Sequence, residues 1–184
     1  MRVIIMGPPG AGKGTQGELL ARRLGIPRYS TGDILRQALR ERTPMGLAAK
    51  RFMRAGELVP DDVMLGIIGE VLASEESANG FLLDGFPRTV AQAEGLRRTL
   101  EEMGLGLDAV VNLTVPDDVI MHRLSTRGRK DDLAKTIRRR LEVYRAQTKP
   151  VLDWYADAGV RILAIEGVGD IEEIQQQILG CLAL

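Results

Sequence analysis

The stretch Gly7-Pro8-Pro9-Gly10-Ala11-Gly12-Lys13-Gly14-Thr15-Gln16 directly follows the apolar run at residues 3–6. This order predicts a strand, a glycine-rich loop and a helix. Glycines at this spacing let backbone N–H groups wrap a phosphate, because side chains would block so close an approach. Lys13 adds a charge that can reach the outer phosphates, and the helix points its positive end at the same anion. The stretch therefore predicts a phosphate-binding loop.

One position departs from the general pattern of such loops. A serine or threonine usually follows the lysine directly and binds magnesium. Here that position is Gly14, and the hydroxyl comes one residue later, at Thr15. A glycine-rich turn that binds nothing is the alternative interpretation. Strand, spacing, lysine and helix together favour the phosphate-binding one.

Composition and charge set broad limits. A chain of 184 residues, 45% hydrophobic and 27% charged, suits one globular domain. Lys+Arg and Asp+Glu are both 25, so no overall charge favours nucleic acid or a membrane surface. The N-terminal apolar run is short, and no segment approaches the length of a transmembrane helix. We therefore expect a cytoplasmic protein.

The single cysteine and the single histidine offer little chemistry. Cys181 excludes an internal disulfide and a C-x-x-C zinc pair, and its apolar neighbours predict a buried thiol. His122 is expected on the surface of a helix.

The rest of the chain alternates strands and helices. We expect strands at residues 3–6, 28–29, 81–84, 109–113 and 160–165. The expected helices cover residues 13–24, the region of 34–39, 45–54, 61–72, a segment carrying Gln92, 117–125, a long stretch from 132 past 144 that Pro150 bends or interrupts, and 171–182. This alternation predicts an α/β fold with a doubly wound five-stranded parallel sheet, whose ligands sit at the carboxyl ends of the strands.

Two segments fit the sheet poorly. Residues 30–59 form a helical excursion that is longer than a simple crossover requires, and residues 125–132 form a polar, basic loop. We interpret both as movable flaps over the site. Surface insertions without any role at the site would show the same sequence features, so this alternative stays open.

Two carboxylates stand near the expected site. Asp84 ends a buried strand, where a phosphate-loop protein usually places an acid that faces magnesium through water. Asp33 falls in the first turn of a helix, where a carboxylate interacts favourably with the positive end of the helix dipole. This interaction alone would explain an aspartate at this position.

Basic residues cluster between positions 123 and 145. This run could form a nucleic-acid patch. However, aromatic residues make up only 4% of the chain and do not interleave with the charges, so no stacking platform is visible. On a helix, Arg129, Asp132, Thr136 and Arg140 lie near one side, which fits a few inward-pointing arginines.

Together these motifs resemble the adenylate kinase family. The resemblance covers essentially the whole chain and rests on the phosphate loop, residues 30–33 (STGD) with Arg36, 56–61 (GELVPD), 84–88 (DGFPR), and 127–132 (RGRKDD) followed by Arg140. Within this family Gly14-Thr15 is the expected form. The lid resembles the short, zinc-free version. The resemblance implies a core of 1–29, 60–124 and 133–184, an insertion that binds the nucleoside monophosphate (NMP) at 30–59, and a short lid at 125–132.

The resemblance also implies a reaction. Magnesium ATP and AMP would give two ADP reversibly, by in-line transfer in a closed, arginine-lined site, in a monomer. Such transfer needs positive charge in a dry site rather than a strong base.

The implied catalytic residues are Lys13, Arg88, Arg123, Arg129 and Arg140. The implied ATP-binding residues are Gly10, Ala11, Gly12, Lys13, Gly14, Thr15, Arg123, Arg127 and Gly169. The implied AMP-binding residues are Thr31, Arg36, Glu57, Leu58, Val59, Gly85, Phe86, Pro87, Arg88, Gln92, Arg129 and Arg140. Asp84 and Asp33 would orient hydrated magnesium.

Base choice depends on two positions. Gln92 carries a carbonyl and an amide, which complement the amino group and ring nitrogen of adenine. Taken alone, however, it would be interpreted as an exposed helix residue. Thr31 offers a hydroxyl beside it. UMP/CMP kinases usually have alanine at the position of Thr31, so we expect AMP as the substrate and a UMP/CMP kinase as the alternative. An RNA-binding role of the basic cluster is a weaker hypothesis, and the absence of an N-K-x-D motif argues against a GTPase.

Overall fold

A parallel sheet forms the centre of the structure, a computed structural model that describes residues 1–128 and 133–183. Within these residues the sheet has five strands in the order β2-β3-β1-β4-β5, all parallel. The strands are β1 (Arg2–Met6), β2 (Arg28–Ser30), β3 (Phe81–Asp84), β4 (Ala109–Thr114) and β5 (Ile162–Glu166). The predicted doubly wound parallel sheet is confirmed.

The strand register brings the motifs of the sequence to one edge of the sheet. Ile5, two residues before the phosphate loop, pairs with Asp84, and Asp84 pairs with Ser30 on its other side. Because all strands are parallel, their carboxyl ends meet at this edge. The phosphate loop, Asp84 and the start of the helix after β2 therefore lie side by side.

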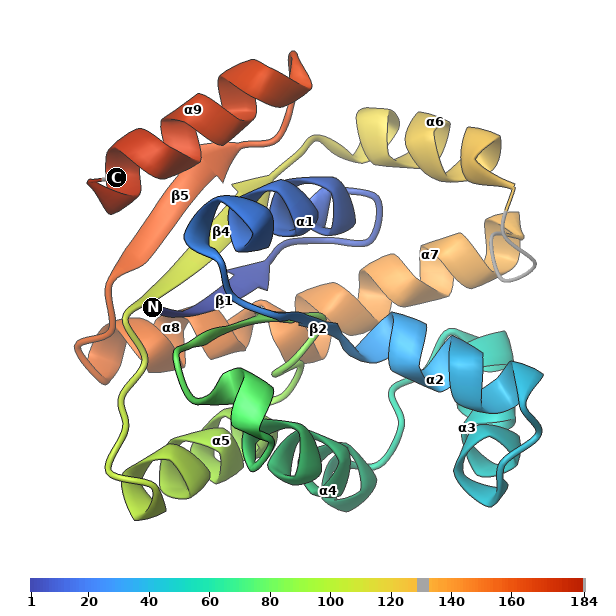
Figure 1. The fold of residues 1–184 in the computed structure, drawn as a ribbon. Coiled ribbons are helices and arrows are strands. Elements are labelled where there is room, and N and C mark those ends of the chain that lie inside the picture. Colours follow the sequence, from blue (N-terminus) through green and yellow to red (C-terminus); the bar gives the residue numbers. More distant parts are fainter. Residues whose placement is uncertain (129–132, 184) are drawn as a thin grey trace.

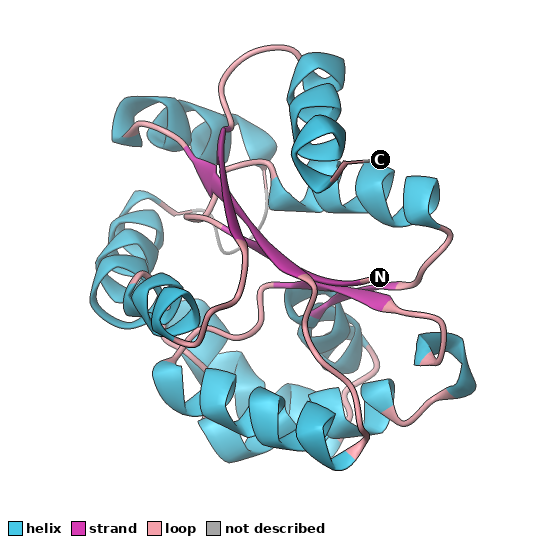
Figure 2. Cartoon of the chain, turned by 90° about the vertical axis from the view of Figure 1, so that its left-hand side faces the viewer, coloured by secondary structure: helices cyan, strands magenta, loops and turns pink. Residues whose placement is uncertain are grey.

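Helices cover both faces of the sheet, as Figure 2 shows with the sheet nearly edge-on. Helices α1 (Lys13–Leu24) and α9 (Ile171–Leu182) pack on one face, and α4 (Asp61–Leu72), α5 (Val90–Glu102) and α8 (Pro150–Asp157) pack on the other. Strand β3 is consequently buried at every position, as expected for a strand covered on both sides. In the described part of the chain, no helix is both long and apolar enough to cross a membrane.

Two short helices project beside the sheet. They are α2 (Thr31–Arg40) and α3 (Pro44–Ala55), at the right of Figure 1. The hydroxyl of Ser30 accepts a hydrogen bond from the Asp33 N–H, and that of Thr43 accepts one from the Gly46 N–H, so each helix begins at a side-chain cap. Gly56 ends α3 with φ 74°, which favours glycine.

The remaining elements of the described chain are two helices and two short helical turns. Helix α6 (Asp117–Arg127) and helix α7 (Ala134–Val143) flank the segment 129–132, which lies outside the described residues. A π-helical turn (Tyr144–Thr148) joins α7 to α8, and a 3-10 turn (Glu75–Ser77) precedes β3. The Lys149 N–H donates to the Tyr144 carbonyl 2.8 Å away, so the predicted interruption near Pro150 is a widened turn.

Two predictions from the sequence need correction. Helix α6 continues to Arg127, so residues 125–127 are helical rather than loop, because nothing breaks the helix before Gly128 at φ 69°. Cys181 is exposed rather than buried. It lies beside the stripe of Ile174, Ile178 and Leu182 that faces the sheet, not on it.

Packing of α2 against α3 depends on Gly46. A Cβ at this position would lie 2.2 Å from the backbone of Ala38. We expect Gly46→Ala to lower the free energy of unfolding by about 1–3 kcal/mol, because the two helices must separate. Urea unfolding followed by circular dichroism measures this change.

Gly66→Ala is the matched control. Gly66 lies in α4 with no atom within 4 Å of its added Cβ, so alanine should raise stability by about 0.5–1 kcal/mol. Equal effects of the two substitutions would contradict the close packing of α2 on α3.

Candidate functional site

A cleft of about 650 Å³ opens at the carboxyl edge of the sheet. Its walls come from the phosphate loop, the ends of β2 and β3, helices α2, α6 and α7, and the segment after α3. Every predicted site residue in the described part of the chain lines this cleft. Arg129 lies outside the described residues.

The phosphate loop has the geometry that its glycines require. A Cβ on Gly7 would lie 2.6 Å from the Leu113 carbonyl oxygen, so only glycine fits there. Gly12 has φ 96° directly before the first residue of α1, a conformation that L side chains rarely adopt. Gly12 therefore lets the chain turn into α1 with its first N–H groups toward the cleft, as an anion site needs.

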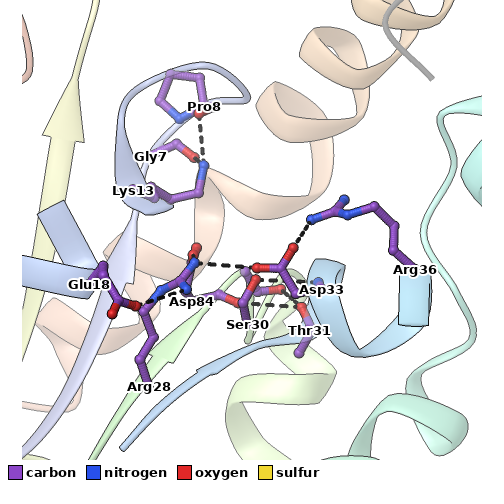
Figure 3. Close-up of polar contacts among 11 residues, drawn as sticks. Gly7, Pro8, Lys13, Glu18, Arg28, Ser30, Thr31, Asp33, Arg36 and Asp84 are labelled. Carbon is purple, nitrogen blue, oxygen red and sulfur yellow. Dashed lines mark hydrogen bonds and ion pairs between the residues drawn. The ribbon is translucent and has the colours of Figure 1, made fainter. Parts of the chain in front are cut away.

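Lys13 lies at the bottom of the cleft. Its ammonium group donates to the carbonyl oxygens of Gly7 and Pro8, each 2.8 Å away (Figure 3). Burial lowers the pKa of Lys13 from 10.5 to about 8, and Asp84 partly opposes this shift. Three nearby arginines lower the pKa further: Arg88, Arg140 and Arg127. A concentration of positive charge of this kind favours binding of a polyanion.

Arg88 is held at several points of its backbone and side chain. Its Nε donates to the Gly85 carbonyl at 2.7 Å, and its carbonyl accepts from the Thr148 hydroxyl at 2.9 Å. Burial and the nearby Arg140 lower the pKa of Arg88 to about 10. Arginine stays charged even so, and its guanidinium is fixed toward the cleft before any ligand arrives.

Gln92 and Thr31 are buried polar residues that line the cleft. Gln92 is only 1% exposed, so the interpretation as an exposed helix residue is wrong. Its Oε1 accepts from the Arg88 N–H, and its Nε2 donates to the Asp61 carboxylate, both at 2.7 Å. The Thr31 hydroxyl donates to the Gly85 carbonyl at 2.8 Å. These bonds hold both side chains in defined orientations.

Arg28 connects the two predicted metal-facing carboxylates. Its Nη2 lies 2.6 Å from Asp84 and 3.6 Å from Asp33 (Figure 3). Asp33 also contacts Arg36 at 2.5 Å. Although burial raises the pKa of Asp33, hydrogen bonds from Arg36 and Ser30 hold it below its usual range. Arg28 was not among the residues predicted from the sequence. The one signal that could have identified it is its position on the strand beside β3.

A second ion pair that the sequence did not predict joins the α3 region to α7. Arg139 contacts the Glu57 carboxylate at 2.7 Å, and a Cβ on Gly56 would lie 3.1 Å from the Thr136 carbonyl. The loop after α3 therefore rests on the helix that also carries Arg140.

The end of the cleft away from Gln92 and Thr31 lies between α1, α6 and α9. Arg123 approaches the Gly10 carbonyl at 3.5 Å, and Arg127 lies one turn further along α6. Gln16, which the sequence analysis did not select, donates to the Ile171 carbonyl at 2.9 Å. This bond places the loop with Gly169 beside the phosphate loop.

The carboxylates fit a hydrated magnesium ion. Among the described residues, no group of three or more His, Cys, Asp or Glu side chains is arranged so that it could hold a metal ion by itself. Magnesium commonly keeps several waters and uses one or two carboxylates together with phosphate oxygens. Asp84, beside Lys13 in the cleft, is a donor of that kind.

A phosphate loop, a parallel sheet and an arginine-lined cleft define a P-loop phosphate-binding protein.

Comparison with known sequences shows the family within this class of protein. The family described as Adenylate kinase matches residues 5–160. The chain is 50% identical to an adenylate kinase of Corynebacterium glutamicum over 182 residues, which is 99% of each chain. It is 50% identical to an adenylate kinase of Leptospira biflexa over 97% of each chain, and 48% identical to adenylate kinase 1 of a Nostoc species over 98%. The chain belongs to the adenylate kinase family, as its motifs predicted.

The lowered pKa of Lys13 predicts proton uptake on binding. Above pH 8 the free lysine is largely neutral, and a bound polyphosphate raises its pKa because the charged form is favoured. At pH 9, ATP binding should take up about one proton, and at pH 7 almost none. Titration calorimetry in buffers of different ionisation enthalpy measures this uptake.

Lys13→Met supplies the control, since it removes the titrating group. Uptake at pH 9 that persists in this variant would assign the proton to another residue.

Proposed function

We propose that this protein catalyses the reversible, magnesium-dependent transfer of the γ-phosphoryl group of ATP to AMP, which gives two ADP. The observation that carries the proposal is the gathering of cations from separate elements around one cleft at the phosphate loop. Family membership supports the same reaction. The attacking phosphate oxygen of AMP is already anionic at neutral pH, so the reaction needs positive charge and alignment rather than a strong base.

The ATP side is assigned to the phosphate loop and to α6. Backbone N–H groups of residues 10–15 would hold the phosphates, with Lys13 exchanging its contacts to Gly7 and Pro8 for phosphate oxygens. Arg123 and Arg127 would add charge from the rim. The loop at Gly169, which Gln16 holds beside α1, would contact the adenine.

The AMP side is assigned to the NMP-binding insertion at 30–59 and to the segment after β3. Arg36, Arg88 and Arg140 would bind the AMP phosphate and the group in transfer, with Arg129 as an expected further cation. Gln92 and Thr31 would bind the base, beside the backbone of residues 57–59 and 85–87. Adenine is the preferred base because Gln92 presents both an acceptor and a donor.

Asp84, with Asp33 beside it, would hold the waters of a magnesium ion. When bound, the ion would supply positive charge that offsets the negative charge developing in transfer. The lid at 125–132 and the insertion would close over both nucleotides and exclude water, which otherwise would accept the phosphoryl group. We further propose a cytoplasmic monomer without zinc, as the family resemblance implies; light scattering measures the mass.

Product analysis with ATP, magnesium and one of AMP, CMP, UMP or GMP tests the reaction. We expect rapid ADP formation with AMP alone, and a decrease of about 10²–10³-fold in turnover for Lys13→Met. Lys149→Met, on the exposed turn after the π-helix, is the control. Transfer to CMP or UMP in place of AMP would favour the alternative, a UMP/CMP kinase.

Base recognition has a separate test. Gln92→Leu should lower kcat/KM for AMP by about 10–100-fold, because it removes the proposed bonds to the base and leaves the Arg88 N–H without the Gln92 acceptor. KM for ATP should change less than about twofold, since Gln92 lies away from the phosphate loop.

Gln37→Leu makes the same chemical change on α2. Within the described residues, the Gln37 side chain hydrogen-bonds only to Glu41. This substitution should leave both kinetic parameters unchanged. An equal rise of KM for ATP and AMP in Gln92→Leu would point to general damage instead of base recognition.

A further inference from the structure

Arg28 places a charge inside the cleft to which the proposed reaction gives no role. Arg28 is the first residue of β2, which lies beside β3, and its side chain is 16% exposed. Figure 3 shows it beside Asp84. The guanidinium contacts three carboxylates from three different elements. Nη2 lies 2.6 Å from Asp84 and 3.6 Å from Asp33, and Nη1 lies 3.6 Å from Glu18 on α1. The shortest of these contacts, to the carboxylate assigned to magnesium, dominates.

Glycines on α1 provide the space for this side chain. A Cβ on Gly14 would lie 3.4 Å from Nη2 of Arg28, and one on Gly17 would lie 3.4 Å from its Nε. Both are van der Waals contact distances, so the guanidinium lies directly beside these two positions of α1. The Nε is buried and has no hydrogen-bond partner among the described residues. The carboxylates, rather than full hydrogen bonding, therefore fix the position of the group.

The location of Nη2 near Gly14 is informative. In the general phosphate-loop pattern, this position carries the serine or threonine whose hydroxyl binds magnesium. Here the position has no side chain, and the guanidinium of Arg28 lies against it. The Arg28 guanidinium thus lies next to the position from which other phosphate loops present a metal ligand.

We propose that Arg28 is a positioning residue that serves as the built-in counter-cation of Asp84, so that a divalent metal ion must compete with its guanidinium. This inference rests on the proposed function, which assigns Asp84 to hydrated magnesium. Arg28 neutralises Asp84 while no metal is present, and it shifts toward Asp33 and Glu18 when a metal binds. Asp33 also contacts Arg36, so the shift reaches a residue assigned to AMP.

The competition has a defined sign. Removal of the positive charge leaves Asp84 available and removes repulsion toward the metal, so metal affinity should rise. A side chain needed only to support the fold would have the opposite effect, because its loss would loosen Asp84. The direction of the change therefore separates the two roles.

The experiment measures metal binding without turnover. Mn²⁺ is titrated into the enzyme bound to β,γ-methylene ATP, and the free ion is read from its EPR signal. We expect Arg28→Gln to bind Mn²⁺ roughly fivefold more tightly than the unmodified protein, the size expected for a partly exposed ion pair. Arg28→Lys, which keeps the charge, should remain close to the unmodified protein. Arg28→Met fills the same space without charge and serves as the second variant if Arg28→Gln does not fold.

Arg22→Gln is the matched control, because Arg22 also lies 3.6 Å from Glu18 but is 74% exposed and outside the cleft. It should leave Mn²⁺ affinity unchanged. Unchanged or weaker binding in Arg28→Gln would overturn the proposal. Asp84→Asn tests the assignment of Asp84 separately from the role of Arg28. If Asp84→Asn does not weaken Mn²⁺ binding, the assignment of Asp84 to the metal fails. If Asp84→Asn weakens Mn²⁺ binding but Arg28→Gln does not tighten it, only the role of Arg28 is overturned.

Discussion

Repulsion between Lys13 and the arginines around it is the interaction on which the cleft depends. Lys13 is half-buried, and burial, together with nearby Arg88, Arg140 and Arg127, lowers its pKa, whereas Asp84 raises it. Such an arrangement costs folding free energy, which other bonds of the fold offset. The Lys13 ammonium is held by carbonyls of its own loop, and Arg88 by Gly85 and Thr148. A polyanion would relieve the repulsion, and its binding energy could then contribute to the proposed closure of the site.

The order of elements could be predicted from the sequence because local signals mark it. Helix α1 begins after Gly12 and ends at Gly25, both in the left-handed conformation, and α9 has the predicted bounds. Buried runs such as Phe81–Asp84 identify strands without reference to distant residues. The parallel register then follows, because a strand, a crossover helix and the next strand connect in only one common way.

Contacts between long side chains could not be predicted in the same way. Arg28 meets Asp84 because β2 and β3 are neighbours, although 56 residues separate the two in sequence. Arg139 meets Glu57 across 82 residues. The burial of Gln92 and the exposure of Cys181 depend on the rotation of a helix by a fraction of a turn. Motif resemblance predicted residues that line the cleft, whereas the partners that orient them required the structure.

Helix α7 links the two halves of the cleft. It carries Arg140, whose charge acts on both Lys13 and Arg88, and it supports the loop after α3 through the backbone of Thr136 and the ion pair of Arg139. The π-helical turn that follows places Thr148 on the Arg88 carbonyl. A displacement of this one helix would therefore alter the phosphate loop's electrostatic surroundings, the position of Arg88 and the wall assigned to AMP together. Rigid packing of α7 against Ile120 and Leu124 on α6 resists such a displacement, and so keeps the cations in place before either nucleotide binds.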